Sequence, residues 1–261
     1  MTTLAPSPVR PVFPLSRRLG NVVRLHVANP FAIIVTPLLI LAIIFAANWV
    51  VWALIRSALG GDQGAVEGFS EGLQYSGASF WIFVYMMVVA IQAMNLTFPL
   101  ALGFGSTRRD FYLGAAISFV GLSALFTAVY TVMALLEWAT GGWGLGGTMF
   151  TSPVFGFADT GFVLRTFHIF CAFVFFFFVG AAIATTYVRW KARGLLAFFA
   201  VFTVVLLGGA AALTYTDNWP AFGEFFLAIG FTGGYSLALG VAALAGIAGW
   251  LVLRRATPRS S

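Results

Sequence analysis

Ionisable residues are scarce in this chain of 261 residues, which has 14 Lys and Arg, 8 Asp and Glu, and 2 His. Charged residues make up 8% of the sequence, whereas they make up roughly 25% of a typical soluble domain. Hydrophobic residues make up 61%. This shortage of charge excludes a soluble globular protein and predicts an integral membrane protein.

Three residue types are too rare for several kinds of chemistry. Cys171 is the only cysteine, which excludes an intramolecular disulfide and a multi-cysteine metal site, and we interpret it as a small buried hydrophobe. Lys191 is the only lysine and lies in Trp-Lys-Ala, so the Gly-Lys-Ser/Thr motif of a phosphate-binding loop is absent. His26 and His168 do not make a paired haem site, because His26 lies outside the expected spans. We therefore expect no enzyme activity, metal or cofactor in this chain itself.

The charges that are present are sorted by loop. One set of alternate loops carries twelve of the 14 basic residues and one acid, Asp110: Arg10, Arg17, Arg18, Arg24, Arg108, Arg109, Arg189, Lys191, Arg193, Arg254, Arg255 and Arg259. The other set carries the remaining acids with Arg56 and Arg165: Asp62, Glu67, Glu71, Glu137, Asp159, Asp217 and Glu224. Basic residues near span ends stay in the cytoplasm. We therefore expect a cell-membrane protein with both termini and the loop around Thr107 in the cytoplasm. Because the positive charge is explained by this sorting, we do not interpret it as a nucleic-acid-binding surface.

Apolar runs of about 20 residues or more recur along the chain, and a helix of that length crosses a hydrocarbon core of about 30 Å. Helices also satisfy their own backbone hydrogen bonds in lipid. The sequence therefore predicts an all-α bundle of six transmembrane helices within residues 30–253, followed by a cytoplasmic tail, 254–261. The expected spans cover residues 31–55, 79–102, 111–136, 164–188, 195–215 and 235–253.

Residues 1–29 are expected to form a cytoplasmic segment with an amphipathic helix from Ser16. Val22 and its apolar neighbours at helical spacing fall on one face, whereas Arg17 and Arg24 fall on the other. This pattern is typical of an interfacial helix whose basic side meets anionic headgroups. Residues 1–14 lack an apolar core, so no cleaved signal peptide is expected.

The last apolar stretch is too long for one span. Residues 220–253 carry a single charge, Glu224, whereas one span needs about 20 residues. The pair Gly233 and Gly234 divides the stretch into 220–232, which is too short to cross, and 235–253. We expect a short re-entrant exterior segment before the sixth span, and one long tilted helix is the alternative.

Polar side chains within the spans are few. Gln92, Asn95 and Thr97 lie in the inner half of the second span, where they either bond between helices or contact a substrate. Every acid lies at a boundary or in a loop, which weighs against proton-coupled transport. Glu137, for example, lies near the same exterior interface as Arg56 and Arg165, and we expect a structural ion pair there.

An intramembrane serine protease is the enzyme alternative. Ser236 follows Gly234 and Tyr235 in a Gly-x-Ser triplet, and His168 is the only candidate base within a span. Such triplets are common in glycine-rich spans, and here histidine precedes serine, which is the reverse of the rhomboid order. The inventory therefore disfavours a protease.

The stretch 98–114 is a charged interruption between two long apolar runs. Thr107 is followed three residues later by Asp110, just ahead of an apolar run. This pattern predicts a helix start, because the hydroxyl and the carboxylate each satisfy a free backbone N–H. We expect Thr107 to cap a helix, and Arg108 and Arg109 to lie exposed.

The loop matches a known family pattern. It reads Gly103, Phe104, Gly105, Ser106, Thr107, Arg108, Arg109, Asp110 and Phe111. Together with a basic N-terminal helix and six spans, it resembles the permease subunits of bacterial type-2 ABC exporters, whose loop between the second and third spans usually reads Gly-hydrophobic-Ser/Thr-Arg-Arg/Lys-x-Phe. Those permeases also carry an exterior re-entrant segment before the last span.

The resemblance implies a partner-driven exporter of a hydrophobic, lipid-like, drug or peptide substrate. The nine loop residues above would be the coupling region that docks on a separate ATPase subunit, where ATP and Mg bind. A second permease chain, identical or not, would complete the membrane part, with surrounding lipids. The implied substrate-lining candidates are Phe80, Phe83, Met87, Gln92, Phe198, Phe202 and Thr203. A non-transporting membrane scaffold or sensor is the rival class.

Overall fold

A computed structural model of the protein describes residues 14–60, 63–158 and 160–255, and these form helices and connecting loops with no strand among them. The helices are α1 (Leu15–His26), η1 (Phe31–Val35), α2 (Thr36–Ala58), α3 (Gln63–Leu73), α4 (Trp81–Gly103), α5 (Arg108–Ala139), η2 (Gly142–Gly146), η3 (Pro153–Phe155), α6 (Phe162–Tyr215) and α7 (Trp219–Leu253). Most of the expected tail and the charges Arg10, Asp62, Asp159 and Arg259 lie outside the described residues.

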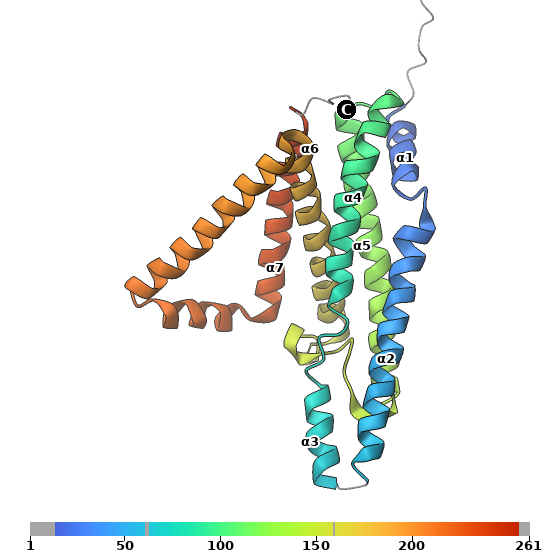
Figure 1. Cartoon of the computed structure of the whole chain (residues 1–261), viewed down its shortest axis with the longest axis vertical. Helices are drawn as coiled ribbons and strands as arrows, with labels where there is room; N and C mark the ends of the chain where they lie inside the picture. The colour runs from blue at the N-terminus through green and yellow to red at the C-terminus, as the bar shows by residue number, and fades with distance from the viewer. Residues whose placement is uncertain (1–13, 61–62, 159, 256–261) are drawn as a thin grey trace, which may run out of the picture.

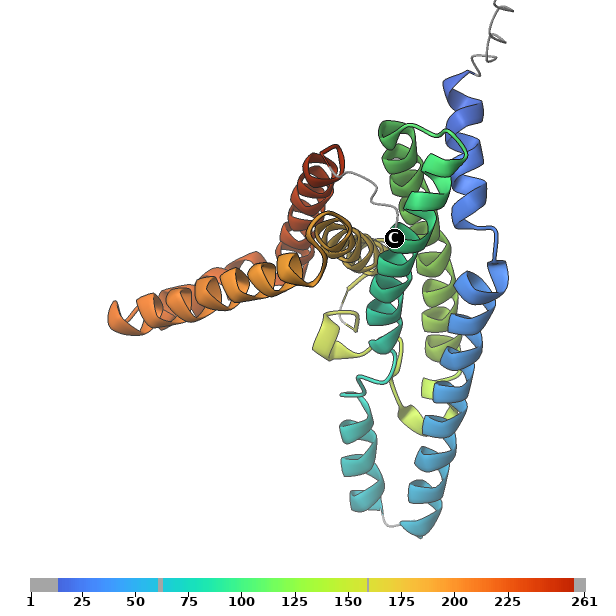
Figure 2. The same ribbon diagram turned by 45° about the horizontal axis from the view of Figure 1, so that its top comes forward.

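The described chain contains five helical stretches that are long and apolar enough to span a membrane, and they start at Phe31, Trp81, Arg108, Phe162 and Trp219. The all-helical prediction is confirmed for the described residues, and the five long apolar helices indicate a multi-pass membrane protein. The helices α2, α4 and α5 and the first part of α6 run side by side, with α1 beside one end of α5 (Figures 1 and 2).

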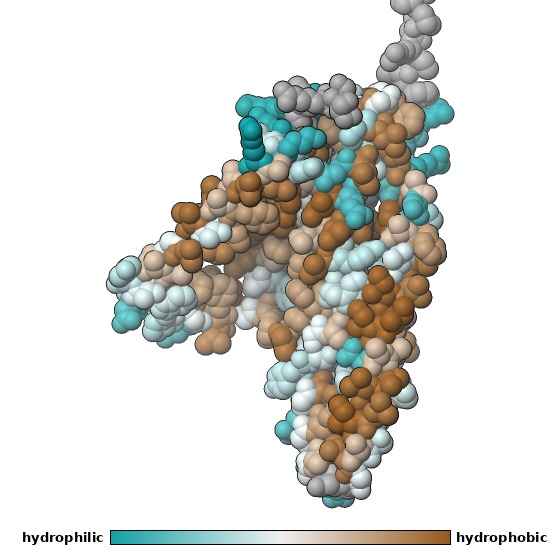
Figure 3. Space-filling view, viewed as in Figure 1, coloured by the Kyte–Doolittle hydropathy of each residue, from teal (hydrophilic) through white to brown (hydrophobic). Residues whose placement is uncertain are grey.

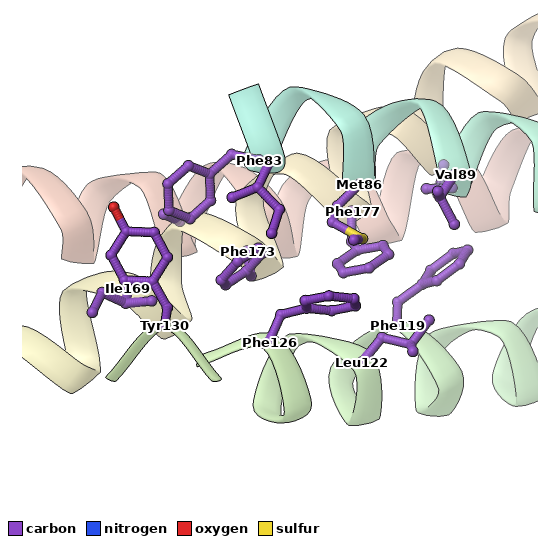
Figure 4. Close-up of a cluster of buried hydrophobic side chains, with 14 of the residues drawn as sticks. Phe83, Met86, Val89, Phe119, Leu122, Phe126, Tyr130, Ile169, Phe173 and Phe177 are labelled. Carbon is purple, nitrogen blue, oxygen red and sulfur yellow. The ribbon is translucent and has the colours of Figure 1, made fainter. Parts of the chain in front are cut away.

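The core lies between α4, α5 and α6 and is filled mainly by aromatic rings (Figure 4). The ring centroids of Phe83 on α4 and Phe173 on α6 are 4.5 Å apart, and those of Phe119 on α5 and Phe177 on α6 are 5.3 Å apart. Gly180 brings α6 close to α4, because a Cβ there would lie 2.5 Å from the Met87 carbonyl oxygen. Small residues permit this approach between membrane helices, where packing takes the place of the hydrophobic effect.

Two backbone interruptions divide α6 and α7. Lys191 has φ 57° and ψ −150°, and the chain reverses direction there (Figure 1). Gly230 has φ 58° and ψ −171° within α7, so the break falls at this glycine and not at the predicted Gly233-Gly234 pair. Both figures show residues 192–229, which we call the arm, projecting from the bundle (Figures 1 and 2).

Other predicted boundaries also shift. The expected exterior loop after the first span contains the helix α3, which the polar sequence did not indicate. A π-helical turn, η1, precedes Pro37, which lies in the first turn of α2. The expected fourth and fifth spans form the two parts of α6 on either side of Lys191.

The loop after α5 is organised around the buried carboxylate of Glu137. Its Oε2 accepts hydrogen bonds from Trp143 Nε1 at 2.8 Å, Met149 N at 2.7 Å and Phe150 N at 3.0 Å. Its Oε1 accepts from Thr151 N at 2.8 Å. A carboxylate with several N–H donors is a strong arrangement, because each bond is charge-assisted and the side chain is only 1% exposed.

The predicted ion pair of Glu137 with Arg56 or Arg165 is absent from the described residues. Arg56 instead donates from Nη1 to the Gly144 carbonyl oxygen at 2.9 Å. The glycine-rich loop offers many backbone amides near the end of α5, and these satisfy the carboxylate in place of a cation.

Replacing Glu137 with Gln is expected to lower the free energy of unfolding by about 3 kcal/mol, because the neutral amide weakens several charge-assisted bonds and turns a donor toward backbone N–H groups. Thermal unfolding of the purified chain, followed by tryptophan fluorescence, measures this loss. Glu71→Gln on exposed α3 is the matched control and is expected to change little. An equal loss in both variants would contradict the role of the carboxylate.

Candidate functional site

Backbone hydrogen bonds fix the first half of the turn between α4 and α5, where the chain leaves α4. Gly105 has φ +82° and its N–H donates to Leu102 O at 2.9 Å, while Ser106 N donates to Ala101 O at 3.0 Å. These two bonds form a Schellman motif, which needs a left-handed residue and so favours glycine. The turn therefore has one defined conformation. We call residues 103–109, the exposed part of the predicted coupling region 103–111, the coupling turn.

Thr107 caps α5 as predicted. Its hydroxyl oxygen accepts a hydrogen bond from Asp110 N at 3.1 Å, and its own backbone is extended. The Asp110 carboxylate, however, does not complete the reciprocal capping box that the sequence suggested. It is buried and accepts from Arg18 Nη1 of α1 at 2.9 Å.

The first turns of α5 also bond to α7. Arg108 Nη1 donates to the Arg254 carbonyl oxygen at 2.9 Å, and the Tyr112 hydroxyl donates to the Gly246 carbonyl oxygen. Gly249 lies close to the same hydroxyl, because a Cβ there would be 3.0 Å from Tyr112 Oη. The start of α5 is thus joined to α1 by an ion pair and to α7 and its C-cap by two hydrogen bonds.

The predicted coupling residues divide into exposed and buried sets. Phe104 is 76% exposed. Arg109 is exposed as predicted, whereas Arg108 is half-buried by its bond to α7. Phe111 is fully buried against Phe98, so it supports the turn from inside and offers no contact surface in this conformation. Gly103, Gly105 and Thr107 are exposed and Ser106 is half-buried.

His26 of α1 packs against Phe111, next to the coupling turn. The sequence did not predict that it lies near this turn. Its ring centroid is 5.3 Å from that of Phe111, and its Nδ1 donates to the Val22 carbonyl oxygen at 3.0 Å. Its Nε2 is 3.4 Å from Thr97 Oγ1 on α4. Burial lowers the pKa of His26 below its usual 6.5, although the bond to Val22 opposes this shift.

A large pocket of about 1100 Å³ opens beside the same end of the bundle, between α4 and the Lys191 reversal of α6. Hydrophilic side chains gather at this end, above a mostly apolar surface (Figure 3). The lining residues come from the end of α4 and from both sides of the reversal: Asn95, Phe98, Pro99, Thr186, Tyr187, Val188, Arg189, Trp190, Lys191, Arg193, Gly194, Ala197, Phe198, Val201, Phe202 and Val205.

The predicted substrate-lining residues are only partly brought together. Phe198 and Phe202 line the large pocket, and Gln92 and Thr203 are exposed but outside its lining. Phe80 and Phe83 instead line a cavity of about 100 Å³ nearer the other end, and Phe83 is part of the packed core. Met87 is half-buried, with its backbone close to Gly180. Tyr187 and Trp190 also line the pocket but were not predicted to do so. In the sequence, an aromatic residue near the end of a span looks the same whether it lies at the membrane interface or lines a pocket.

The protease alternative lacks its central contact. The Ser236 hydroxyl donates to the Thr232 carbonyl oxygen at 2.8 Å, whereas His168 Nε2 lies 2.9 Å from Thr232 Oγ1 and its ring stacks on Tyr235. A nucleophilic serine needs a base within hydrogen-bond reach. His168 is bonded to a different hydroxyl, so this arrangement offers Ser236 no base.

Comparisons with protein-family models, with curated proteins and with solved structures gave no match to this chain.

Breaking the Arg18–Asp110 pair is expected to lower the free energy of unfolding by about 1 kcal/mol, because the Arg18 side chain is 42% exposed and so partly screened by solvent, although Asp110 is buried. Arg18→Gln, Asp110→Asn and the double variant form a cycle, with Arg24→Gln on the exposed face of α1 as control. Thermal unfolding should show that the second change adds little once the first is made. Fully additive losses would mean that the two side chains do not interact.

The stability of the protein is expected to fall as the pH drops below about 6.5, because the unfolded chain then binds a proton at His26 that the folded chain, with its lowered pKa, does not. The loss continues until the pH reaches the folded pKa. Unfolding midpoints of the wild type and of His26→Gln, measured from about pH 8 to about pH 5, test this. The variant should have the flatter profile, and parallel profiles would exclude His26 as the source.

Proposed function

We propose that the chain is the permease subunit of an ATP-driven ABC transporter of the type-2 exporter class, working with a separate ATPase subunit. The observation that carries the proposal is the coupling turn, a conformationally defined turn at the basic end that exposes Phe104 and Arg109. Aromatic residues and arginine are enriched where protein partners bind. The sequence has no phosphate-binding loop of its own, so ATP and Mg would bind in the partner.

The helix lengths support a six-span topology. The 54 residues of α6 would make a helix of about 81 Å if straight, which is far more than a core of about 30 Å. The reversal at Lys191 divides α6 into two spans, and the break at Gly230 divides α7 into a short segment and a final span. In this proposal residues 219–229 are the exterior re-entrant segment, and both termini with the coupling turn are cytoplasmic.

The arm supports a second permease chain as partner. Its apolar residues are widely exposed, and examples are Val204 at 70%, Leu207 at 66% and Leu227 at 83%. A neighbouring chain and membrane lipids would cover this surface. The arm also carries Phe198 and Phe202, so the large pocket would lie along the path that two permeases enclose.

Transmission of force follows from the contacts of α5. Closure of the ATPase subunits would move the coupling turn, and the bonds of Asp110 to α1 and of Arg108 and Tyr112 to α7 would carry the movement into the bundle. Differential binding of ATP to two arrangements would then shift the population between them. Export as the direction rests on the family resemblance alone.

The test is ATPase activity that co-purifies with the full-length tagged chain from its own host. Phe104→Glu with Arg109→Glu should reduce this activity at least about tenfold, because a tenfold change in affinity corresponds to about 1.4 kcal/mol of contact energy. Arg255→Glu, exposed near the same end, is the matched charge control and should retain it.

Equal activity in the double variant and the control would refute docking at the coupling turn. Absence of any ATP-hydrolysing partner with the wild-type chain would favour the scaffold or sensor class.

A further inference from the structure

The large pocket has a polar rim and apolar walls. Its rim carries three cations, Arg189, Lys191 and Arg193, and none of the described residues that line it is acidic. Two of the cations lie on aromatic rings, Arg189 at 4.3 Å from the Trp190 centroid and Lys191 at 5.7 Å from the Tyr187 centroid. Such cation–π contacts hold the Arg189 guanidinium and the Lys191 ammonium in place beside the rings.

The apolar wall continues from the rim along the arm. Phe198, Val201, Phe202 and Val205 recur at helical spacing, so they form one stripe about 10 Å long. Val201 is 63% exposed and Val205 65% exposed, so the stripe is open along its length. A ligand that fits both parts has a negatively charged head and an apolar tail.

A buried polar atom lies on the α4 side of the pocket. Asn95 Oδ1 has no hydrogen-bond partner in the described chain, although it is shielded from solvent, and Asn95 lines the pocket. An unpaired buried acceptor is costly unless something donates to it. A hydroxyl or amine on the bound molecule supplies that donor.

The backbone at the rim is strained. Lys191 has φ 57° and ψ −150°, a region that residues other than glycine rarely occupy. Charge sorting across the membrane explains basic residues in this loop, but it requires neither a strained lysine nor a pocket beside it. Strain held next to a concave charged site is typical of binding sites.

We propose that this pocket binds an anionic membrane phospholipid, its phosphate on Arg189, Lys191 and Arg193 and its acyl chain along the stripe of the arm. Arginine and lysine are the usual phosphate partners, and the adjacent Trp190 and Tyr187 suit the membrane interface. Identifying this lipid with the transported substrate rests on the proposed function, whereas the binding itself does not.

The first experiment compares lipid adducts on the purified full-length chain by native mass spectrometry. Phosphatidylglycerol and phosphatidylcholine with identical acyl chains are offered together. The wild type should retain phosphatidylglycerol at least about fivefold in preference, because both lipids carry a phosphate but only phosphatidylglycerol has a net negative headgroup for the three cations to bind. The triple variant Arg189→Gln, Lys191→Gln and Arg193→Gln should lose this preference.

The matched control removes the same number of positive charges away from the pocket through Arg56→Gln, Arg254→Gln and Arg255→Gln. It should keep the preference of the wild type. If both triple variants lose the preference for phosphatidylglycerol equally, the preference comes from overall surface charge and not from the pocket. If the Arg189, Lys191 and Arg193 variant keeps the preference, the proposed site is excluded. Thermal unfolding checks that each variant is folded, and a Lys191→Arg variant, which keeps the charge, should bind as the wild type does.

The second experiment tests the tail of the ligand. Val201→Trp with Val205→Trp fills the apolar wall without changing charge and should reduce phosphatidylglycerol retention several-fold, whereas Val204→Trp, on the arm but outside the lining, should not. Inorganic phosphate and glycerol phosphate are added as competitors. Displacement of the lipid by either would mean a site for a free anion and would overturn the proposal.

No ATPase is present in these measurements. Loss of lipid preference would therefore leave the docking test unaffected, and failure of docking would leave lipid binding unaffected.

Discussion

A peptide group inside a bilayer has no water to bond, and this constraint shapes every part of the structure. The spans are helical because helices satisfy their own N–H and C=O groups. The chain reverses where polar groups gather, at Lys191 beside Arg189 and Arg193, and at the Schellman turn beside Arg109. Figure 3 shows hydrophilic side chains gathered at this end of the molecule. At the opposite end, Glu137 receives the amides of a glycine-rich loop that forms little regular structure.

The coupling turn and the large pocket share one helix. Asn95 and Pro99 of α4 line the pocket, and α4 ends at Gly103, where the coupling turn begins. Gly103 follows Pro99 by four positions, which is about 6 Å along the helix axis. A partner that displaces the turn would therefore move one wall of the pocket, which links the proposed docking and the proposed lipid site through a rigid element.

The candidate site was predictable where the cause is local. Thr107 caps α5 because its hydroxyl reaches the backbone N–H of Asp110, three residues later. Arg17 and Arg24 are exposed because helical spacing puts them on the face of α1 opposite Val22. Where partners come from distant segments, prediction failed. The Asp110 carboxylate bonds Arg18, which lies 92 residues earlier, and Glu137 bonds loop amides in place of a predicted cation.

Aromatic residues show the same limit. Phe104 and Phe111 lie in one short loop and were predicted to share a surface, yet one is 76% exposed and the other fully buried. Phe111 follows the first turn of α5 and faces Phe98 and His26, which only the packing of α1, α4 and α5 brings together. Likewise the break in α7 falls at Gly230 and not at the Gly233-Gly234 pair, although any of these glycines is able to adopt a positive φ.

The sequence by itself determined the membrane class, the helical architecture and the start of α5, because hydropathy, span length and a capping hydroxyl act within one segment. Only the tertiary structure decided which charges pair, which loop residues face outward and that a pocket with a cationic rim lies beside the coupling turn. Those features depend on contacts between helices that are far apart in the chain, and hydrophobic patterning is nearly uniform across the faces of helices this apolar.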